Sequence, residues 1–272
     1  MIDPTVIGAL LLLGLGFLAF GGDGNEETEE DTSEDTLDES ARFSGLSPQD
    51  DIKTFVRFDD EDDVADLGDG KQVAFGESGN DQIAGGAGDD EIFLAFGNDK
   101  SFIDEDLDGL PDDPVTGAMG DDFIRGGDGN DILIDGEGSN EIFGDLKSDF
   151  IDVTENDPSA TDAADTAYGG FGADTLVGDD GDILYGGDNE DSFFVELDGS
   201  SDDPVTIGDY EAGEEITVMV PADTTVTEAS ATVNESGTGL NVTMDGELIL
   251  TVEGITDLDD LNLAFEATLP SA

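Results

Sequence analysis

The sequence has no histidine, no cysteine and no tryptophan among its 272 residues. Their absence excludes Ser-His-Asp and Cys-His catalysis, HExxH zinc sites, thiolate metal sites, disulfides and thiol redox motifs. Positive charge is also scarce, because 7 Lys and Arg stand against 71 Asp and Glu, a formal net charge of -64. Such an acidic surface repels phosphate backbones, so nucleic acid is excluded as a partner.

Apolar residues are few as well. Hydrophobic residues make up 36% of the chain, while glycine reaches 38 residues against 8 prolines. A core built from ordinary helices and strands is difficult to assemble from this composition. Mutual repulsion of the acidic groups opposes a compact state unless cations neutralise it, so a hard cation is the first partner to expect.

The uncharged stretch at the N-terminus is Val6 to Phe20. It falls short of the ~17–20 apolar residues that a bilayer-spanning helix needs. Three interpretations of residues 1–22 stay open: a retained anchor that makes the membrane a partner through residues 6–20, a cleaved signal segment, and a soluble helix. Residues 23–51 are acidic and aperiodic, which predicts a disordered linker. Residues 52–75 are expected to form a first strand, from Thr54 to Phe58, and an N-terminal cap.

From Gly76 onward the sequence repeats with a period of nine residues. The pattern is G-G-x-G-x-acid-x-apolar-x, with intact copies at Gly85, Gly126 and Gly169. Ten units fall in three blocks within residues 76–194, separated by predicted inserts at 103–116 and 153–168. Their sixth positions are Asp81, Asp90, Asp99, Asp122, Asp131, Asn140, Asp149, Asp174, Asp182 and Asp191. Their eighth positions are Ile83, Ile92, Ser101, Ile124, Leu133, Ile142, Ile151, Leu176, Leu184 and Phe193.

This pattern predicts a stack of short strands. Six glycine-rich residues make a tight turn, and the three that follow make a strand too short to bury its apolar residue alone. Successive strands must therefore stack, with two units closing one coil of 18 residues and the eighth-position side chains pointing inward. The sixth-position carboxylates then line the two edges beside turn carbonyls of the next coil. Oxygen-only ligands of this kind suit Ca²⁺.

The repeats resemble the RTX (repeats-in-toxin) nonapeptide over about 120 residues. The resemblance implies an all-β fold, a right-handed parallel β-roll (a β-solenoid), with several Ca²⁺ ions along its edges. It also implies folding on calcium binding and export through a type I secretion system. The family's side-chain ligands map onto the sixth positions, and its carbonyl ligands map onto Gly85, Ala87, Gly126, Asp128, Gly169 and Phe171. Four departures from the pattern weaken it locally: Asn140, Lys147, Ser101 and the short unit 178–185.

The insert between the first two blocks contains a second calcium motif. Its aspartates follow D-x-D-x-D-G-x-x-D spacing, similar to thrombospondin type 3 and EF-hand loops, at Asp104, Asp106, Asp108 and Asp112. Position twelve is Val115 where such loops carry a bidentate Glu. An additional weak calcium site and an acidic surface loop both stay open. The second insert has no ligand spacing and is interpreted as a plain excursion.

Residues 195–272 change in character. Alternating apolar residues at 217–220, 232–233, 240–244 and 247–252, with Asp245-Gly246 as a hairpin turn, predict a small antiparallel β cap. Residues 257–265 are expected to form a short helix. The segment Ile207 to Ile216 resembles the sequence that follows RTX repeats and precedes a C-terminal secretion signal.

The leading functional hypothesis is a calcium-binding, exported or cell-surface protein without enzymatic activity, anchored to a membrane if residues 6–20 are retained. An adhesin or matrix-attachment module is the alternative, with an adhesion partner that the sequence does not identify. A carboxylate-based hydrolase is the third hypothesis, although the repeat already accounts for every conspicuous carboxylate.

Overall fold

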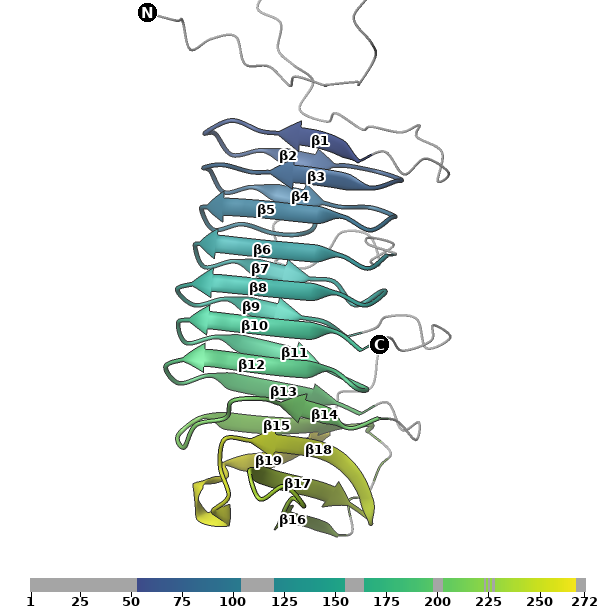
Figure 1. Ribbon diagram of the computed structural model, residues 1–272, viewed down its shortest axis with the longest axis vertical. Coiled ribbons are helices and arrows are strands. Elements are labelled where there is room, and N and C mark those ends of the chain that lie inside the picture. Colours follow the sequence, from purple (N-terminus) through teal and green to yellow (C-terminus); the bar gives the residue numbers. More distant parts are fainter. Residues whose placement is uncertain are drawn as a thin grey trace, which may run out of the picture.

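The computed structural model describes residues 53–103, 120–154, 164–197, 203–222, 224, 226 and 228–267. Short strands stack along one long axis, and the chain passes back and forth between two facing sheets as it advances along that axis (Figure 1). This is the parallel β-roll that the repeat predicts. The expected linker at 23–51 and the segment Val6 to Phe20 lie outside the described residues.

The larger sheet, called sheet A below, contains eleven strands. Nine of them, ending with β18 (Glu247–Glu253), run parallel in the order β1-β3-β5-β6-β8-β10-β12-β14-β18. Their bounds are β1 Thr54–Arg57, β3 Gln72–Phe75, β5 Glu91–Phe96, β6 Phe123–Asp128, β8 Glu141–Leu146, β10 Thr166–Phe171, β12 Ile183–Asp188 and β14 Val205–Ile207.

The opposite sheet, sheet B, contains six parallel strands and continues toward the N-terminus as a separate pair. The six are β7 Ile132–Ile134, β9 Phe150–Asp152, β11 Thr175–Gly178, β13 Ser192–Glu196, β15 Glu215–Val220 and β19 Leu263–Ala267, and the pair is β2 Val64–Asp66 with β4 Gln82–Ala84. Between β4 and β7 only the isolated bridges of Lys100 continue the sheet. This gap lies at Ser101, where the repeat lacks its large apolar residue.

Strand register confirms the coil of 18 residues. Glu141 pairs with Phe123 and Phe150 pairs with Ile132, each one coil apart in sequence. Across the first insert Glu91 pairs with Phe123, and across the second Glu141 pairs with Thr166, in the same register. Inserts are therefore absorbed at the edge turns, because pairing depends on the strand residues alone.

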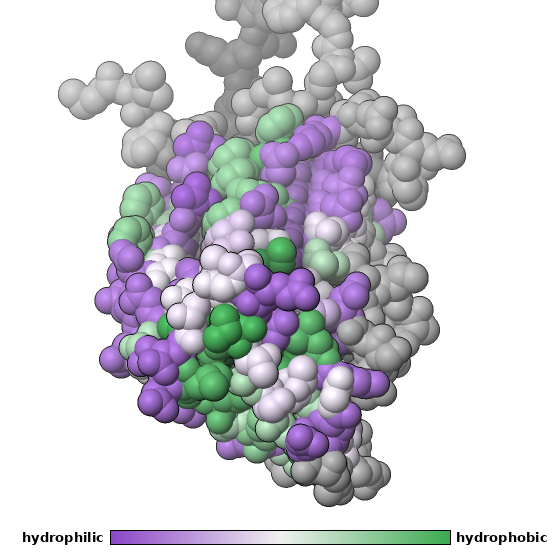
Figure 2. Space-filling model, turned by 60° about the horizontal axis from the view of Figure 1, so that its bottom comes forward, coloured by the Kyte–Doolittle hydropathy of each residue, from purple (hydrophilic) through white to green (hydrophobic). Residues whose placement is uncertain are grey.

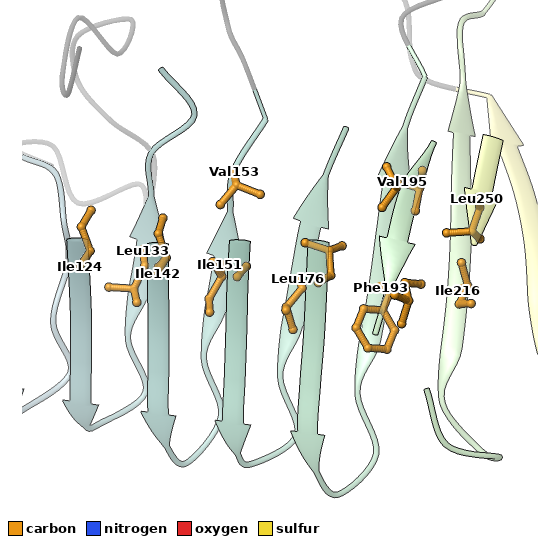
Figure 3. Packing of buried hydrophobic residues seen from close by; sticks show 14 of the residues in the cluster. Ile124, Leu133, Ile142, Ile151, Val153, Leu176, Phe193, Val195, Ile216 and Leu250 are labelled. Carbon is orange, nitrogen blue, oxygen red and sulfur yellow. The ribbon is translucent and has the colours of Figure 1, made fainter. Parts of the chain in front are cut away.

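The core is the row of eighth-position side chains, which point into the space between the two sheets (Figure 3). Ile124 and Ile142 enter from sheet A, and Leu133, Ile151 and Leu176 enter from sheet B. All five are buried, at 2% exposure or less. Their alternation with half-buried or exposed neighbours is the period-two pattern of a strand with one buried face.

The roll is longer than the ten units that the sequence predicts. Strands β1 and β3 pair in parallel with one another and then with β5, so residues 54–75 form coils of the roll. Residues 166–168, which the sequence analysis assigned to the second insert, belong to β10 and pair with β8 and β12. Both segments carry a buried alanine, Ala74 or Ala167, at the eighth position. Alanine is too small to reveal the pattern, although it still points inward.

The C-terminal region departs from the expected cap in two ways. Strand β17 Gly239–Met244 pairs antiparallel with β16 Ala229–Val233 and with β18 Glu247–Glu253, and Asp245-Gly246 forms the predicted hairpin turn. The other edge of β18 pairs in parallel with β14, which joins this hairpin to sheet A. Strand β15, however, pairs in parallel with β13 and β19, so it extends sheet B of the roll. The helix expected at 257–265 is only the 3-10 turn Leu258–Asp260, because the following residues form β19.

The end of the roll formed by β16 to β19 differs in surface character from the flanks. Apolar side chains gather on this end and hydrophilic ones surround it (Figure 2). Leu258 and Val233 are about half exposed, at 50% and 52%. Across the ranges that the structure describes, no helix has the length and apolar character to cross a membrane.

Candidate metal centre

The sixth-position side chains form two rows, one along each edge of the roll. Row 1 lies where the chain passes from sheet A to sheet B, and row 2 lies where it returns. Row 1 contains Asp81, Asp99, Asp131, Asp149, Asp174 and Asp191. Row 2 contains Asp90, Asp122, Asn140 and Asp182. All ten side chains are buried, at 4% exposure or less.

One carboxylate oxygen of each aspartate is used to join successive coils. In row 1 the backbone N–H of Asp99 donates to Oδ1 of Asp131, at 2.8 Å, and the N–H of Asp131 donates to Oδ1 of Asp149, at 2.9 Å. Row 2 repeats the arrangement, because the N–H of Asp90 donates to Oδ1 of Asp122 at 2.6 Å. Each row is thus a ladder in which a side chain of one coil fixes the backbone of the preceding coil.

The second carboxylate oxygen of most row members has no hydrogen-bond partner. It is buried and unpartnered in Asp81, Asp90, Asp99, Asp122, Asp131, Asp149, Asp174 and Asp191. A buried carboxylate oxygen without a donor or cation is energetically unfavourable. Its recurrence at the same position in coil after coil indicates a place for a positive ligand.

The space beside each unpartnered oxygen is kept open by the first glycine of the turn. A Cβ added to Gly76 would lie 2.6 Å from Oδ2 of Asp81 and 2.6 Å from the carbonyl oxygen of Leu94 in the next coil. A Cβ on Gly169 would likewise meet Oδ2 of Asp174 at 2.5 Å and the carbonyl oxygen of Gly186 at 2.6 Å. A carboxylate oxygen and a carbonyl oxygen of consecutive coils therefore border one small space, as the sequence predicts.

Burial changes the acidity of these groups. Loss of solvent raises the pKa of Asp90 and of Asp149 to about 8, and that of Asp81 to about 7. The same cause raises the pKa of Asp131 to about 6, while the backbone N–H of Asp99 acts in the opposite direction. Without a cation these carboxylates hold protons far more tightly than a free aspartate does.

The carbonyl groups at turn position three have a structural role of their own. The carbonyl of Asp128 accepts a hydrogen bond from Gly97 N–H at 3.2 Å, and that of Phe171 accepts one from Lys147 N–H at 2.6 Å. The carbonyl of Ala87 accepts from Gly70 N–H at 2.5 Å. Each carbonyl keeps a second lone pair. Gly85, Gly126 and Gly169 occupy position one of turns in the same rows.

Two row members offer no free carboxylate oxygen. Asn140 is an amide whose Oδ1 accepts the N–H of Asp122 at 2.9 Å, so it keeps the ladder bond and loses the charge. Asp182 lies in the turn that is one residue short, and its Oδ2 accepts the N–H of Asp179 at 2.9 Å. The deletion that the sequence shows at this unit therefore closes the space that stays open in the others.

Lys147 replaces the fourth glycine of its unit without disturbing the row. Its backbone has φ 81°, the left-handed region that glycine would otherwise supply. Its Nζ lies 2.9 Å from Oδ1 of Asp128 and forms an ion pair on the surface. The nearby Asp149 still extends the ladder, because its N–H donates to Asp174 at 2.8 Å.

Sequence reasoning missed three acidic members of the rows. Asp63 precedes Asp81 in row 1, and its N–H donates to Oδ1 of Asp81 at 2.9 Å. Asp165 follows Asn140 in row 2, where its Oδ1 accepts the N–H of Asn140 at 2.5 Å. Glu214 follows Asp191 in the coil after the last repeat, and burial raises its pKa to about 8. The signal available for the first two was an aspartate two residues before a small apolar one, Ala65 or Ala167.

The aspartate loop of the first insert, with Asp104, Asp106, Asp108 and Asp112, lies outside the described residues. Over the ranges that are described, no three acidic side chains converge on one point. A cation in either row would therefore be held by one or two carboxylates together with backbone carbonyl oxygens. That donor set, oxygen alone with few charges per site, fits Ca²⁺.

A comparison with family models agrees with this geometry. The model of the RTX calcium-binding nonapeptide repeat, which spans four copies, matches residues 66–100, 116–151 and 159–193. The third match includes Asp165, in agreement with its place in row 2. A search of curated proteins gave no match. The three matched segments thus contain RTX calcium-binding nonapeptide repeats, and repeats of this kind bind Ca²⁺.

Proposed function

We propose that the chain is an exported or cell-surface protein, without enzymatic activity, whose β-roll folds when several Ca²⁺ ions bind along its two rows. The observation that carries this proposal is that the two oxygens of one carboxylate have different surroundings, and that this difference recurs along the rows. Oδ1 of Asp131 accepts a backbone hydrogen bond, while its Oδ2 is buried without a partner. A polar network satisfied on one side only is a poor basis for stability.

Calcium would supply the missing partners. The residues that would hold it are the row members with an unpartnered Oδ2, together with the carbonyls of the following turn, such as Leu94 beside Asp81 and Gly186 beside Asp174. A bound Ca²⁺ supplies positive charge to the carboxylates and joins the oxygens of neighbouring coils. Because the ligands come together only in the roll, binding free energy becomes folding free energy.

The absence of enzymatic activity is supported by residue types and by burial. The chain has no histidine or cysteine. The buried acidic residues of the described ranges lie in the edge turns, most of them at position six of the repeat. In a recess at row 2, Lys53 and Lys71 form ion pairs with Glu91 and Asp89.

Export is supported by the dependence on calcium. In a compartment with submicromolar calcium the acidic rows would repel each other and keep the chain unfolded, whereas millimolar calcium outside the cell would fold it. Type I secretion and a membrane anchor at residues 6–20 are parts of this proposal that rest on the sequence.

Circular dichroism of the full chain tests the proposal. We expect a coil-like spectrum in EDTA and a β spectrum in millimolar Ca²⁺. Mg²⁺ should be far less effective at the same concentration, because it requires near-octahedral geometry and dehydrates reluctantly. A β spectrum that persists unchanged in chelator, or that Mg²⁺ restores as well as Ca²⁺, would contradict the proposal.

A further inference from the structure

One repeat has its acidic residue in an unusual place. The unit 135–143 begins with Asp135 where the other turns have glycine or an apolar residue, and it carries Asn140 where they have aspartate. The two exceptions occur in the same turn, six residues long, in row 2. The carboxylate has in effect moved from position six to position one.

The environment of Asp135 is unlike that of a surface residue. Its side chain is 1% exposed, and neither Oδ1 nor Oδ2 has a hydrogen-bond partner. Its backbone is held in the roll, since its N–H donates to the carbonyl of Asp152 at 3.0 Å and its own carbonyl accepts from Nδ2 of Asn140 at 3.5 Å. A buried carboxylate with both oxygens unpartnered strongly favours a positive ligand.

Asp135 faces the two neighbouring members of row 2. Besides burial, three interactions raise the pKa of Asp135 well above its usual range: the charge of Asp122 in the preceding coil, the hydrogen bond that a protonated Asp135 shares with Asp122, and the charge of Asp165 in the following coil. Asp122 is 4% exposed, and its Oδ2 has no hydrogen-bond partner. Asp135 begins the turn whose sixth position is Asn140, and its carbonyl accepts from Nδ2 of that residue, so Asp135 lies at the level of the row where Asn140 brings no charge.

We propose that Asp135 is a calcium ligand of row 2 and that it supplies, from position one, the carboxylate that Asn140 does not supply from position six. The site would contain Asp122 and Asp135 as its two carboxylates, completed by turn carbonyls. Asn140 retains the structural half of the sixth-position role, because it still accepts the N–H of Asp122 and donates its own N–H to Asp165. The assignment rests on the proposed function, since it requires the rows to bind calcium.

Three variants of the full chain test the assignment by isothermal titration with Ca²⁺, with circular dichroism in excess calcium as the measure of folding. Asp135→Asn keeps the size of the side chain and removes its charge. Glu141→Gln is the matched control, because it removes one negative charge from an exposed side chain of the same repeat. The double variant Asp135→Gly with Asn140→Asp restores the usual order of the repeat, with glycine at position one and aspartate at position six.

We expect Asp135→Asn to lose one calcium ion per chain or to bind one at least tenfold more weakly. Glu141→Gln and the double variant should match the unmodified chain in stoichiometry. Asp135→Asn binding like the unmodified chain would overturn the assignment. So would a folded double variant that still lacks one ion. If Asp135→Asn does not fold in excess calcium, the double variant decides alone, by regaining or not regaining the full stoichiometry. An unmodified chain that binds no calcium would instead contradict the proposed function.

Discussion

Substitutions at two residues of a single repeat test the edge of the roll and its core separately. Asp131 lies in row 1, and Leu133, two residues later, is fully buried between the sheets (Figure 3). Asp131→Asn removes the charge and one carboxylate oxygen but keeps an Oδ1 that accepts the N–H of Asp99. Asn140 already does this in row 2, with Asp122 as its donor. Leu133→Ala leaves the edge intact and empties part of the core.

The two changes should act on different quantities. A fully buried Leu→Ala substitution costs about 2–5 kcal/mol, through lost apolar contact and the cavity left behind. We expect this loss at every calcium concentration. Asp131→Asn should raise the calcium midpoint of folding, because an unpartnered Oδ2 is no longer available to a cation. In the metal-free chain it should not destabilise, because it removes a buried charge that has no partner there.

The measurement is a calcium titration of each variant by circular dichroism, followed by guanidinium unfolding in saturating calcium. Leu133→Ala should show a lower unfolding midpoint at saturation. Asp131→Asn should show a displaced titration curve and a smaller loss at saturation. Coincident titration curves, together with equal losses in saturating calcium, would refute the assignment of position six to the edge and position eight to the core.

Three further predictions follow from other parts of the chain. In EDTA the β signal should be stronger near pH 4 than near pH 8. The folded chain has raised pKa values, about 6 for Asp131 and about 8 for Asp149, so protonation stabilises the fold fully below the unfolded pKa near 3.8, and this stability is lost as pH rises through the folded pKa values. A spectrum that does not change with pH would contradict this. Tyr210→Phe should cost about 1–3 kcal/mol in calcium-saturated unfolding, because it removes two hydrogen bonds of a buried hydroxyl, to the carbonyl of Glu214 at 2.7 Å and from the N–H of Asn262 at 3.0 Å. Tyr185→Phe, in the ring stack with Tyr168, is the control and should cost little. Replacing Asp104, Asp106 and Asp108 by alanine should remove one weak calcium ion, with a Kd of ~10⁻⁴–10⁻³ M, and leave the β spectrum in excess calcium intact. If calorimetry gives the same calcium stoichiometry as for the unmodified chain, the loop is a plain acidic excursion.

The repeat predicted the roll because its two regular positions, six and eight, act on different parts of the coil. Apolar residues at position eight, such as Leu133 and Leu176, decide which face of each strand is buried, and a slip of one residue would turn them outward. Inserts do not disturb this register, since Thr166 still pairs with Glu141. Alanine at position eight conceals a coil, as Ala74 and Ala167 do, because composition alone does not distinguish a buried alanine from an alanine in a loop.

The C-terminal errors have a different cause. The alternation of residues 215–220 shows one buried face but does not show the direction of the neighbouring strand. The parallel pairing of β15 with β13 therefore depends on the roll already present beside it. The residues expected in a helix became β19 for the same reason, because β15 offers Leu263 and Phe265 a free sheet edge. Tertiary context prevailed over local preference in both cases.

The placement of the sixth-position side chains along the two edges was predictable from the sequence, but the use of each carboxylate oxygen was not. Aspartate at position six serves the fold through Oδ1 and leaves Oδ2 for a cation, and the sequence does not distinguish these two roles. Asn140 shows that the first role survives without the second, and Asp182 shows that a one-residue deletion turns the second oxygen back to the protein. A count of sixth-position carboxylates is therefore an unreliable count of calcium sites. On the proposed function, the rows would hold calcium only where an oxygen remains unpartnered, and a carboxylate from outside the pattern, such as that of Asp135, would provide one equally well.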